Sequence, residues 1–124
     1  MDIRNRVKEF GHVNALDWLS DDWREQGLTA VIAQNDEFAI GMMQALREYG
    51  YEVPRDVSVV GFDSTALCEM CSPRLTSIHV PLEKMGAAAA EMLFRLMRDG
   101  NPDTLSAMLP LDLDVRESTA PCSE

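Results

Sequence analysis

The sequence predicts an α/β fold built on a parallel β-sheet. Residues 29–34 (TAVIAQ) and 57–62 (VSVVGF) are apolar runs without polar alternation, which is typical of strands covered on both faces. Between them, FAIGMMQALREYG carries apolar residues at the spacing of one helical face, and Gly50 is placed to end that helix. This order predicts a right-handed βαβ unit whose two strands end at the same edge of the sheet.

The other elements follow from local patterns. A helix is expected at about residues 13–23, whereas residues 1–10 show no pattern that assigns them. LTSIHV predicts a short strand ended by Pro81, and a second helix is expected at about 82–98 with Gly100 as its stop. LPLDLDVR alternates like a strand, and ESTAPCSE is expected to form a loose tail.

Composition limits the classes of function. A chain of 124 residues with 46% hydrophobic residues can bury one ordinary core. No apolar run reaches the roughly 18 residues of a membrane span, and the first ten residues lack the apolar stretch of a signal peptide, so a cytoplasmic location is expected. With 21 acidic against 11 basic residues, the net charge of −10 repels a phosphate backbone. This piece should not hold DNA by itself.

Polar residues follow both strands of the βαβ unit. Asn35 and Asp36 come after the first strand and Asp63 after the second, and ligands of open parallel sheets bind at this edge. Gly61 lets backbone pass closely there. An amide with one or two carboxylates suits a neutral, hydroxyl-rich ligand. The alternatives are a helix N-cap for Asp36 and a loop cap for Asp63.

Catalysis, a metal site and a cofactor site are not predicted. His12 and His79 have no nearby nucleophile at elbow spacing, and neither a GxGxxG nor a P-loop motif is present. A glycosidase carboxylate pair needs a separation that no sequence shows. The CxxC at residues 68–71 has no second pair of ligands, so both cysteines are expected to be small packing residues.

The first helix is apolar on two sides. Ile40 and Met43 lie opposite the face of Phe38 and Met42, and the helix at 82–98 shows the same arrangement. A partner chain or further parts of the same chain would cover the second face. The alternative is a few tolerated exposed apolar residues.

Several motifs together resemble one family. TAVIAQND, VPRDVSVVGFD, PRLTSI, MGAAAAEML and RES, within about residues 29–119, are similar to the C-terminal half of the effector-binding domain of LacI/GalR-family bacterial transcription repressors. The resemblance implies a periplasmic-binding-protein-like fold in which two α/β subdomains close on a small effector, often a sugar or a nucleobase-like metabolite. It assigns about residues 11–76 and 106–119 to one subdomain and about 77–100 to a helix of the other.

The resemblance also implies ligand-binding residues. Asn35 matches the strand-end position that contacts effector, and Asp63 matches the aspartate of the VGFD motif that bonds effector hydroxyls. Asp36 and Phe62, which adjoin them in the matching motifs, complete the predicted ligand-binding set. Ser64 departs from the family, because many members carry a second acidic residue there.

A dimer surface is implied by the same resemblance. It comprises Ile40, Met43 and Arg47 on the first helix, with Met70 and Cys71 in the loop after the second strand. Family members read DNA through an N-terminal helix-turn-helix, which this chain does not contain.

The sequence therefore predicts the C-terminal part of a LacI/GalR-type regulator, without enzyme activity, that binds a small effector and forms a homodimer or higher oligomer. One rival is a solute-binding protein of the same fold. A second rival is a small sugar-modifying α/β enzyme. The uncovered apolar faces also raise the hypothesis that the chain persists only as a dimer or exchanged oligomer.

Overall fold

A computed structural model gives the fold and describes residues 2–20, 23, 25–100 and 106–121. The chain divides into two compact units, which are described separately. Unit 1 comprises Met1–His79 and Leu113–Glu124, and unit 2 comprises Val80–Asp112. The resemblance had placed the first boundary after residue 76 and the return at residue 106.

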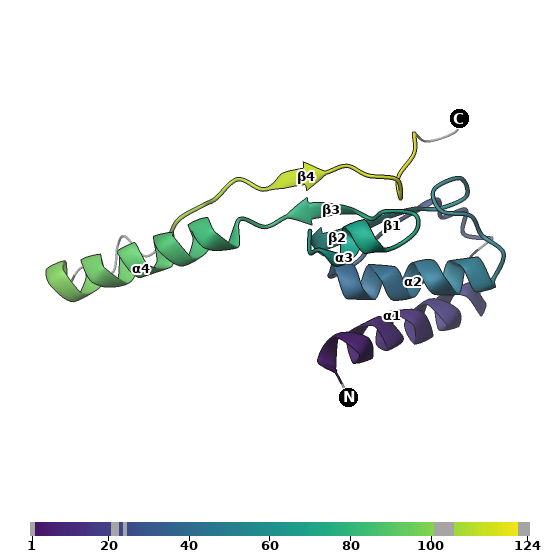
Figure 1. Cartoon of the computed structure of the whole chain (residues 1–124), viewed down its shortest axis with the longest axis horizontal. Coiled ribbons are helices and arrows are strands. Elements are labelled where there is room, and N and C mark those ends of the chain that lie inside the picture. The colour runs from purple at the N-terminus through teal and green to yellow at the C-terminus, as the bar shows by residue number, and fades with distance from the viewer. Residues whose placement is uncertain (1, 21–22, 24, 101–105, 122–124) are drawn as a thin grey trace. The chain divides into compact units, whose positions relative to one another are not determined.

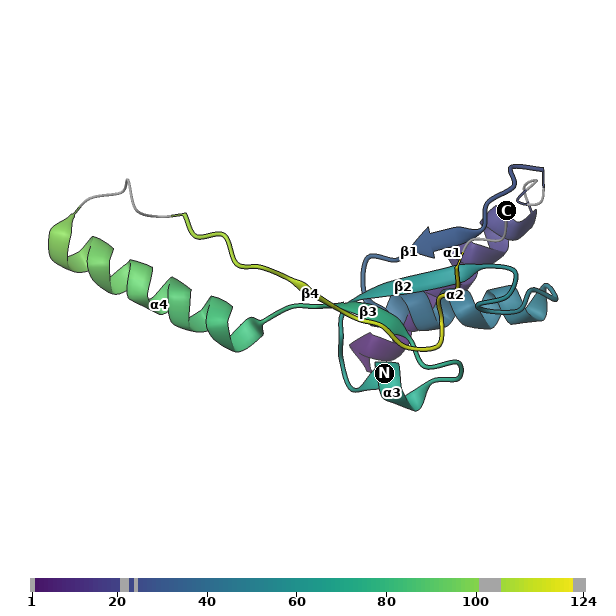
Figure 2. The same cartoon turned by 90° about the horizontal axis from the view of Figure 1, so that it is seen from above.

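A four-stranded sheet forms the centre of unit 1. Its strands are β1 (Ala30–Ile32), β2 (Ser58–Asp63), β3 (Thr76–His79) and β4 (Asp112–Asp114), in that order across the sheet. β1 pairs with β2 and β2 with β3, both in parallel, so the predicted βαβ unit with a parallel sheet is confirmed. The arrows in Figure 1 show β4 running opposite to β3, and Figure 2 shows β1, β2 and β3 side by side.

In the described part of unit 1, three helices accompany the sheet: α1 (Ile3–Ser20), α2 (Asp36–Glu48) and the single turn α3 (Leu67–Met70). Figure 1 shows α2 between the sheet and α1. Two glycines permit the close approach of α1 and α2, since a Cβ at Gly11 would collide with the carbonyl oxygen of Phe38 and one at Gly41 with that of Lys8. The core therefore has three layers, with α2 buried on both sides.

This packing corrects two predictions. α1 begins at Ile3 rather than near residue 13, because its contact with α2 stabilises residues whose own periodicity is weak. The second apolar side of α2 needs little cover from a partner, since Met43 is only 4% exposed and belongs to the core of this chain. Ile40 is half-buried against the same core.

The C-terminal segment is ordered against the sheet as far as the structure describes it, so the prediction of a loose tail is wrong. Ser118 is buried, its Oγ donates to the carbonyl of Val59 at 2.6 Å, and its own carbonyl accepts from the Val59 amide at 2.8 Å. The Thr76 amide donates to Ser118 Oγ at 2.8 Å. A short polar segment is fixed here because it satisfies backbone groups of β2 and β3.

Among its described residues, unit 2 contains one long helix, α4 (Leu82–Asp99), whose bounds agree with the prediction. Gly100 ends it in the left-handed conformation (φ 64°), and its amide bonds the carbonyl of Leu96. None of its residues is buried, and Leu93, Phe94 and Met97 are exposed. No described helix, α4 included, is both long and apolar enough to cross a membrane.

Candidate binding site at the carboxyl edge of the sheet

The turn after β2 places Asp63 at the carboxyl edge of the sheet. Asp63 and Ser64 both have positive φ angles, 103° and 52°, which non-glycine residues rarely adopt. Asp63 is half-buried, and its pKa is raised first by that burial and then by the neighbouring carboxylates of Asp36 and Glu37. An unusual backbone thus holds an acidic group near other acids, a combination found more often at binding sites than elsewhere.

Asp36 supports this turn from the first residue of α2. Its side chain is fully buried, and its two carboxylate oxygens accept from Ser77 Oγ at 2.5 Å and from the Thr65 amide at 2.6 Å. Gly61 gives the space for it, because a Cβ there would collide with Asp36 Oδ1. The strand ends therefore meet as predicted. Both oxygens of Asp36, however, accept hydrogen bonds within the protein, and the side chain presents no surface to a ligand in this structure.

Asn35 is the N-cap of α2. Its Oδ1 accepts from the Phe38 amide at 2.9 Å, with Asn35 in an extended conformation (φ −160°, ψ 174°). The predicted cap is thus made by Asn35 and not by Asp36. The side chain is half-buried, and its Nδ2 group is the donor that it can still offer.

Phe62 lies within β2 opposite Ile78 of β3 and is half-buried. One residue further, Asp63 is opposite His79 in the same parallel register. The predicted ligand-binding residues thus fall into two kinds: Asn35, Phe62 and Asp63 keep accessible surface at the edge of the sheet, whereas Asp36 fixes the turn from within.

A polar cluster beside Asp63 was not predicted from the sequence. Ser64 Oγ donates to Asp114 Oδ2 at 2.5 Å, and Arg116 Nη2 donates to Ser64 Oγ at 3.1 Å. His79 Nδ1 lies 3.3 Å from the same Asp114 oxygen. The bond from Ser64, together with His79 and Arg116, lowers the pKa of Asp114. The signal available in the sequence was weak: an Asp and an Arg two residues apart in the predicted strand LPLDLDVR.

Arg116 is better enclosed than the other charged members of this cluster, with 13% of its side chain exposed against 38% for Asp114 and 49% for His79. Its guanidinium donates to Glu69 Oε1 at 2.5 Å and to the carbonyl of Leu75 at 2.8 Å, and its amide donates to Thr76 Oγ1 at 2.9 Å. The returning C-terminal segment is thereby tied to both α3 and β3.

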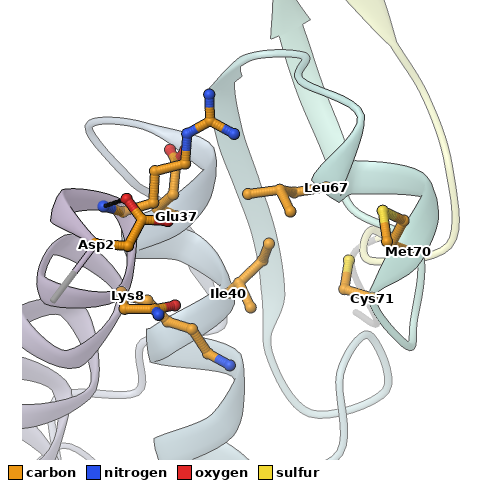
Figure 3. A pocket seen from close by; sticks show the side chains of 9 residues that line it. Asp2, Lys8, Glu37, Ile40, Leu67, Met70 and Cys71 are labelled. Carbon is orange, nitrogen blue, oxygen red and sulfur yellow. Dashed lines mark hydrogen bonds between the residues drawn. The ribbon is translucent and has the colours of Figure 1, made fainter.

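A separate hollow of about 380 Å³ lies where α1, α2 and α3 meet (Figure 3). Three of the five residues predicted for a dimer surface line it: Ile40, Met70 and Cys71. Met70 is 79% exposed. The rim of this hollow is charged and comprises Asp2, Arg4, Lys8 and Glu37.

The other two predicted dimer residues lie elsewhere. Met43 is buried in the core, so it offers almost no surface to a partner. Arg47 is exposed and donates to the carbonyl of Ser72 at 2.5 Å, and both Met43 and Arg47 line a smaller hollow of about 170 Å³. The structure therefore brings together only part of the predicted surface.

The cysteines of the CxxC are free thiols. Cys68 is fully buried, and burial, followed by the neighbouring Asp36, raises its pKa to about 12. Burial also raises the pKa of Cys71, whose Sγ donates to the carbonyls of Cys68 and Pro73. Raised pKa values oppose thiolate chemistry. Among the described residues, no three His, Cys, Asp or Glu side chains are grouped so that they could hold a metal ion.

The fold and the site at the strand ends together define the class of protein to which the chain belongs. The family model for the periplasmic binding protein-like domain matches residues 2–119, and the chain belongs to that family. Within it, the resemblance to LacI-family regulators is confirmed by curated relatives and by similar solved structures.

The curated relatives are transcription regulators. The chain is 34% identical to the HTH-type transcriptional regulator RegA of Clostridium acetobutylicum over 94% of this chain and 36% of that protein. It is 41% identical to the HTH-type transcriptional regulator DegA of Bacillus subtilis over 75% of this chain and 28% of that protein. The chain thus spans about a third of the length of these relatives.

Solved structures agree. A LacI family transcriptional regulator from Enterococcus faecium with bound ribose is 31% identical, with a TM-score of 0.75 over 94% of this chain and 42% of that one. The regulator CelR in complex with cellobiose is 31% identical, with a TM-score of 0.78 over 90% of this chain and 33% of that one. The lac repressor dimer bound to operator and an anti-inducer is 29% identical, with a TM-score of 0.80 over 91% of this chain and 38% of that one.

Proposed function

We propose that this chain is the effector-binding and oligomerisation part of a LacI-family transcription regulator. It binds a small hydroxylated metabolite, with sugars the leading class, and controls DNA binding allosterically. The observation that carries the proposal is Asp63, an accessible carboxylate fixed at positive φ at the carboxyl edge of a parallel sheet, where the N-cap Asn35 follows the paired strand β1.

The chemistry of this edge suits a sugar. A carboxylate accepts hydrogen bonds from hydroxyl groups, and the Asn35 amide nitrogen can donate to them. Phe62, the residue before Asp63 in β2, keeps part of its apolar surface accessible, and we propose that it packs against the C–H face of a sugar ring. Similar solved regulators are complexes with ribose, lactose or cellobiose, which supports the same class of ligand here.

The hollow of α1, α2 and α3 is the proposed contact with a second copy of the chain. Its apolar residues Ile40 and Met70 lie within a charged rim that carries both signs, which suits a two-fold contact. A similar solved structure is described as a dimer, the lac repressor. Arg47, at the exposed end of α2, lies outside this hollow, and we place it at the periphery of the proposed contact.

DNA reading is assigned to another part of the regulator. The net charge of −10 makes binding of a phosphate backbone by this chain unfavourable, whereas the relatives are named as HTH-type regulators. A regulator of this kind works in the cytoplasm, where its DNA is. It needs no catalytic group, and the proposal assigns none.

A thermal-shift screen tests this function. Ribose, lactose, cellobiose and arabinose are added to a complete regulator that carries this chain, and at least one should raise the midpoint of unfolding. Asp63→Ala should abolish that rise, and the isosteric Asp63→Asn, which tolerates positive φ, should do the same without disturbing the turn. Asp17→Ala, an exposed carboxylate on α1, is the matched control. An unchanged rise in both Asp63 variants would remove Asp63 from the site.

A further inference from the structure

We infer that Ser64, Asp114 and Arg116 form a clamp that positions Asp63 for its ligand and links the turn after β2 to the chain segments that join the two units. The part of this inference that concerns ligand rests on the proposed function. The clamp itself is a property of the ligand-free chain.

The turn is held from several sides at once. Ser64 Oγ is bonded to Asp114 and Arg116, while the Ser64 amide donates to Ser77 Oγ at 3.1 Å. The Thr65 amide is bonded to the buried Asp36. Since positive φ angles at two successive non-glycine residues are unfavourable, the turn needs such bonds to persist. Asp63 lies within this turn, so the direction of its carboxylate depends on them.

Asp114 connects the turn to both joining segments. β3 ends at His79, the last residue of unit 1 before Val80, and the chain returns to unit 1 at Leu113. A single atom, Asp114 Oδ2, accepts from Ser64 Oγ and lies 3.3 Å from His79 Nδ1 and 3.6 Å from Arg116 Nη2. A displacement of either segment would therefore alter the bonds of Ser64. By reciprocity, a ligand that moves Asp63 would bias the two segments.

Magnitudes decide which of these bonds matters. The His79–Asp114 pair is exposed on both side chains, 49% and 38%, and exposed ion pairs contribute little. The bond from Ser64 to Asp114 is short and involves a charged acceptor, which makes it the stronger contact. The test therefore concentrates on Ser64 and Asp114.

Amide hydrogen exchange measured by NMR on the 124-residue chain without ligand tests the clamp. Asp114→Ala should speed exchange at the Ser64 and Thr65 amides by about tenfold, the size expected for losing one hydrogen bond to a charged group. The Val59 amide, bonded to Ser118, should not change. Asp114→Asn keeps an acceptor oxygen and should restore most of the protection. Asp112→Ala, an exposed carboxylate on the same strand, is the matched control.

Ser64→Ala gives the same test from the other side of the bond. It should speed exchange at Thr65 as Asp114→Ala does, and the double variant should add nothing to either single change. Unchanged exchange at residues 64 and 65, equal acceleration throughout β2, or additive effects of the two substitutions would each overturn the clamp.

A binding measurement separates the clamp from the proposed function. In the complete regulator, titrated with ribose, lactose and cellobiose, Asp63→Asn should abolish binding and Asp114→Ala should weaken it about tenfold. If neither substitution alters binding, the proposed site has failed. If only Asp63→Asn alters it, the site stands and the positioning role of Asp114 is overturned.

Discussion

Helices α2 and α4 share several residue types but lie in opposite environments. Both are rich in alanine and methionine, and each contains one glycine. α2 buries most of its apolar residues between the sheet and α1, including Ala39, Met42 and Leu46, whereas α4 buries none of its 18 residues. An amphipathic sequence thus specifies a face but not the surface that covers it. Unit 1 supplies that surface for α2.

The largest expected effect comes from removing the same side chain in each helix. Leu46 is 1% exposed and Leu93 is 57% exposed. Leu46→Ala should lower the free energy of unfolding of unit 1 by about 2–4 kcal/mol, because it leaves a cavity in a packed core. Leu93→Ala should change it by less than about 0.5 kcal/mol.

Urea unfolding followed by tryptophan fluorescence measures this difference, because Trp18 and Trp23 both belong to unit 1. Equal losses for the two substitutions would contradict the contrast between the helices.

Glycine substitutions should have opposite effects in the two helices. Gly41→Ala places a Cβ against the backbone of Lys8 in α1, and overpacking of this kind costs about 1–3 kcal/mol. Gly86→Ala meets no atom within 4 Å and should instead raise the stability of α4 by up to about 1 kcal/mol through helix propensity. Urea unfolding and far-ultraviolet circular dichroism distinguish the two outcomes. Greater stability of unit 1 in Gly41→Ala would show that α1 does not pack closely on α2.

Thiol labelling gives another measure of packing in unit 1. With Cys68 fully buried and its pKa raised to about 12, iodoacetamide should modify the native Cys68 at least about tenfold more slowly than in the urea-unfolded chain. Mass spectrometry of the peptide that contains residues 68–71 measures both rates. Rapid modification of native Cys68 would instead indicate a reactive thiol and contradict a packing role for the CxxC.

The smallest effect concerns the charge at Asp63. Its pKa is raised in the folded protein, so the free energy of unfolding should fall as pH rises from the ordinary carboxyl pKa through the raised value. Asp63→Asn lacks this titration and should be more stable than wild type at neutral pH, by a margin that shrinks in acid. Urea unfolding from pH 4 to 8 measures this, with Asp17→Asn as control. A less stable Asp63→Asn at neutral pH would contradict the crowding of acids at the edge.

Local patterns predicted α2, α4 and the parallel strands, because continuous apolar runs and helical spacing are properties of neighbouring residues. The position of Asp63 followed from the rule that parallel strands end at one edge. α1 was placed too late because it depends on contact with α2. The C-terminal segment was misread because Ser118 is fixed by bonds to distant strands.

The polar contacts of the site escaped prediction for the same reason. Ser64 and Asp114 lie 50 residues apart in the chain, and no local pattern pairs them. The burial of Asp36 depends on Ser77 and Gly61, which come from two other positions in the sheet. Sequence reasoning located the strand ends, and the side-chain geometry had to come from the fold.

The most direct test of the central claim is an NMR titration, with ribose, lactose and cellobiose, of a complete regulator that carries this chain. The account predicts chemical-shift changes for at least one sugar at the amides of residue 35 and residues 61–65, and their loss in Asp63→Asn. Changes confined to other residues, or the same changes in Asp63→Asn, would contradict a sugar site at the carboxyl edge of this sheet.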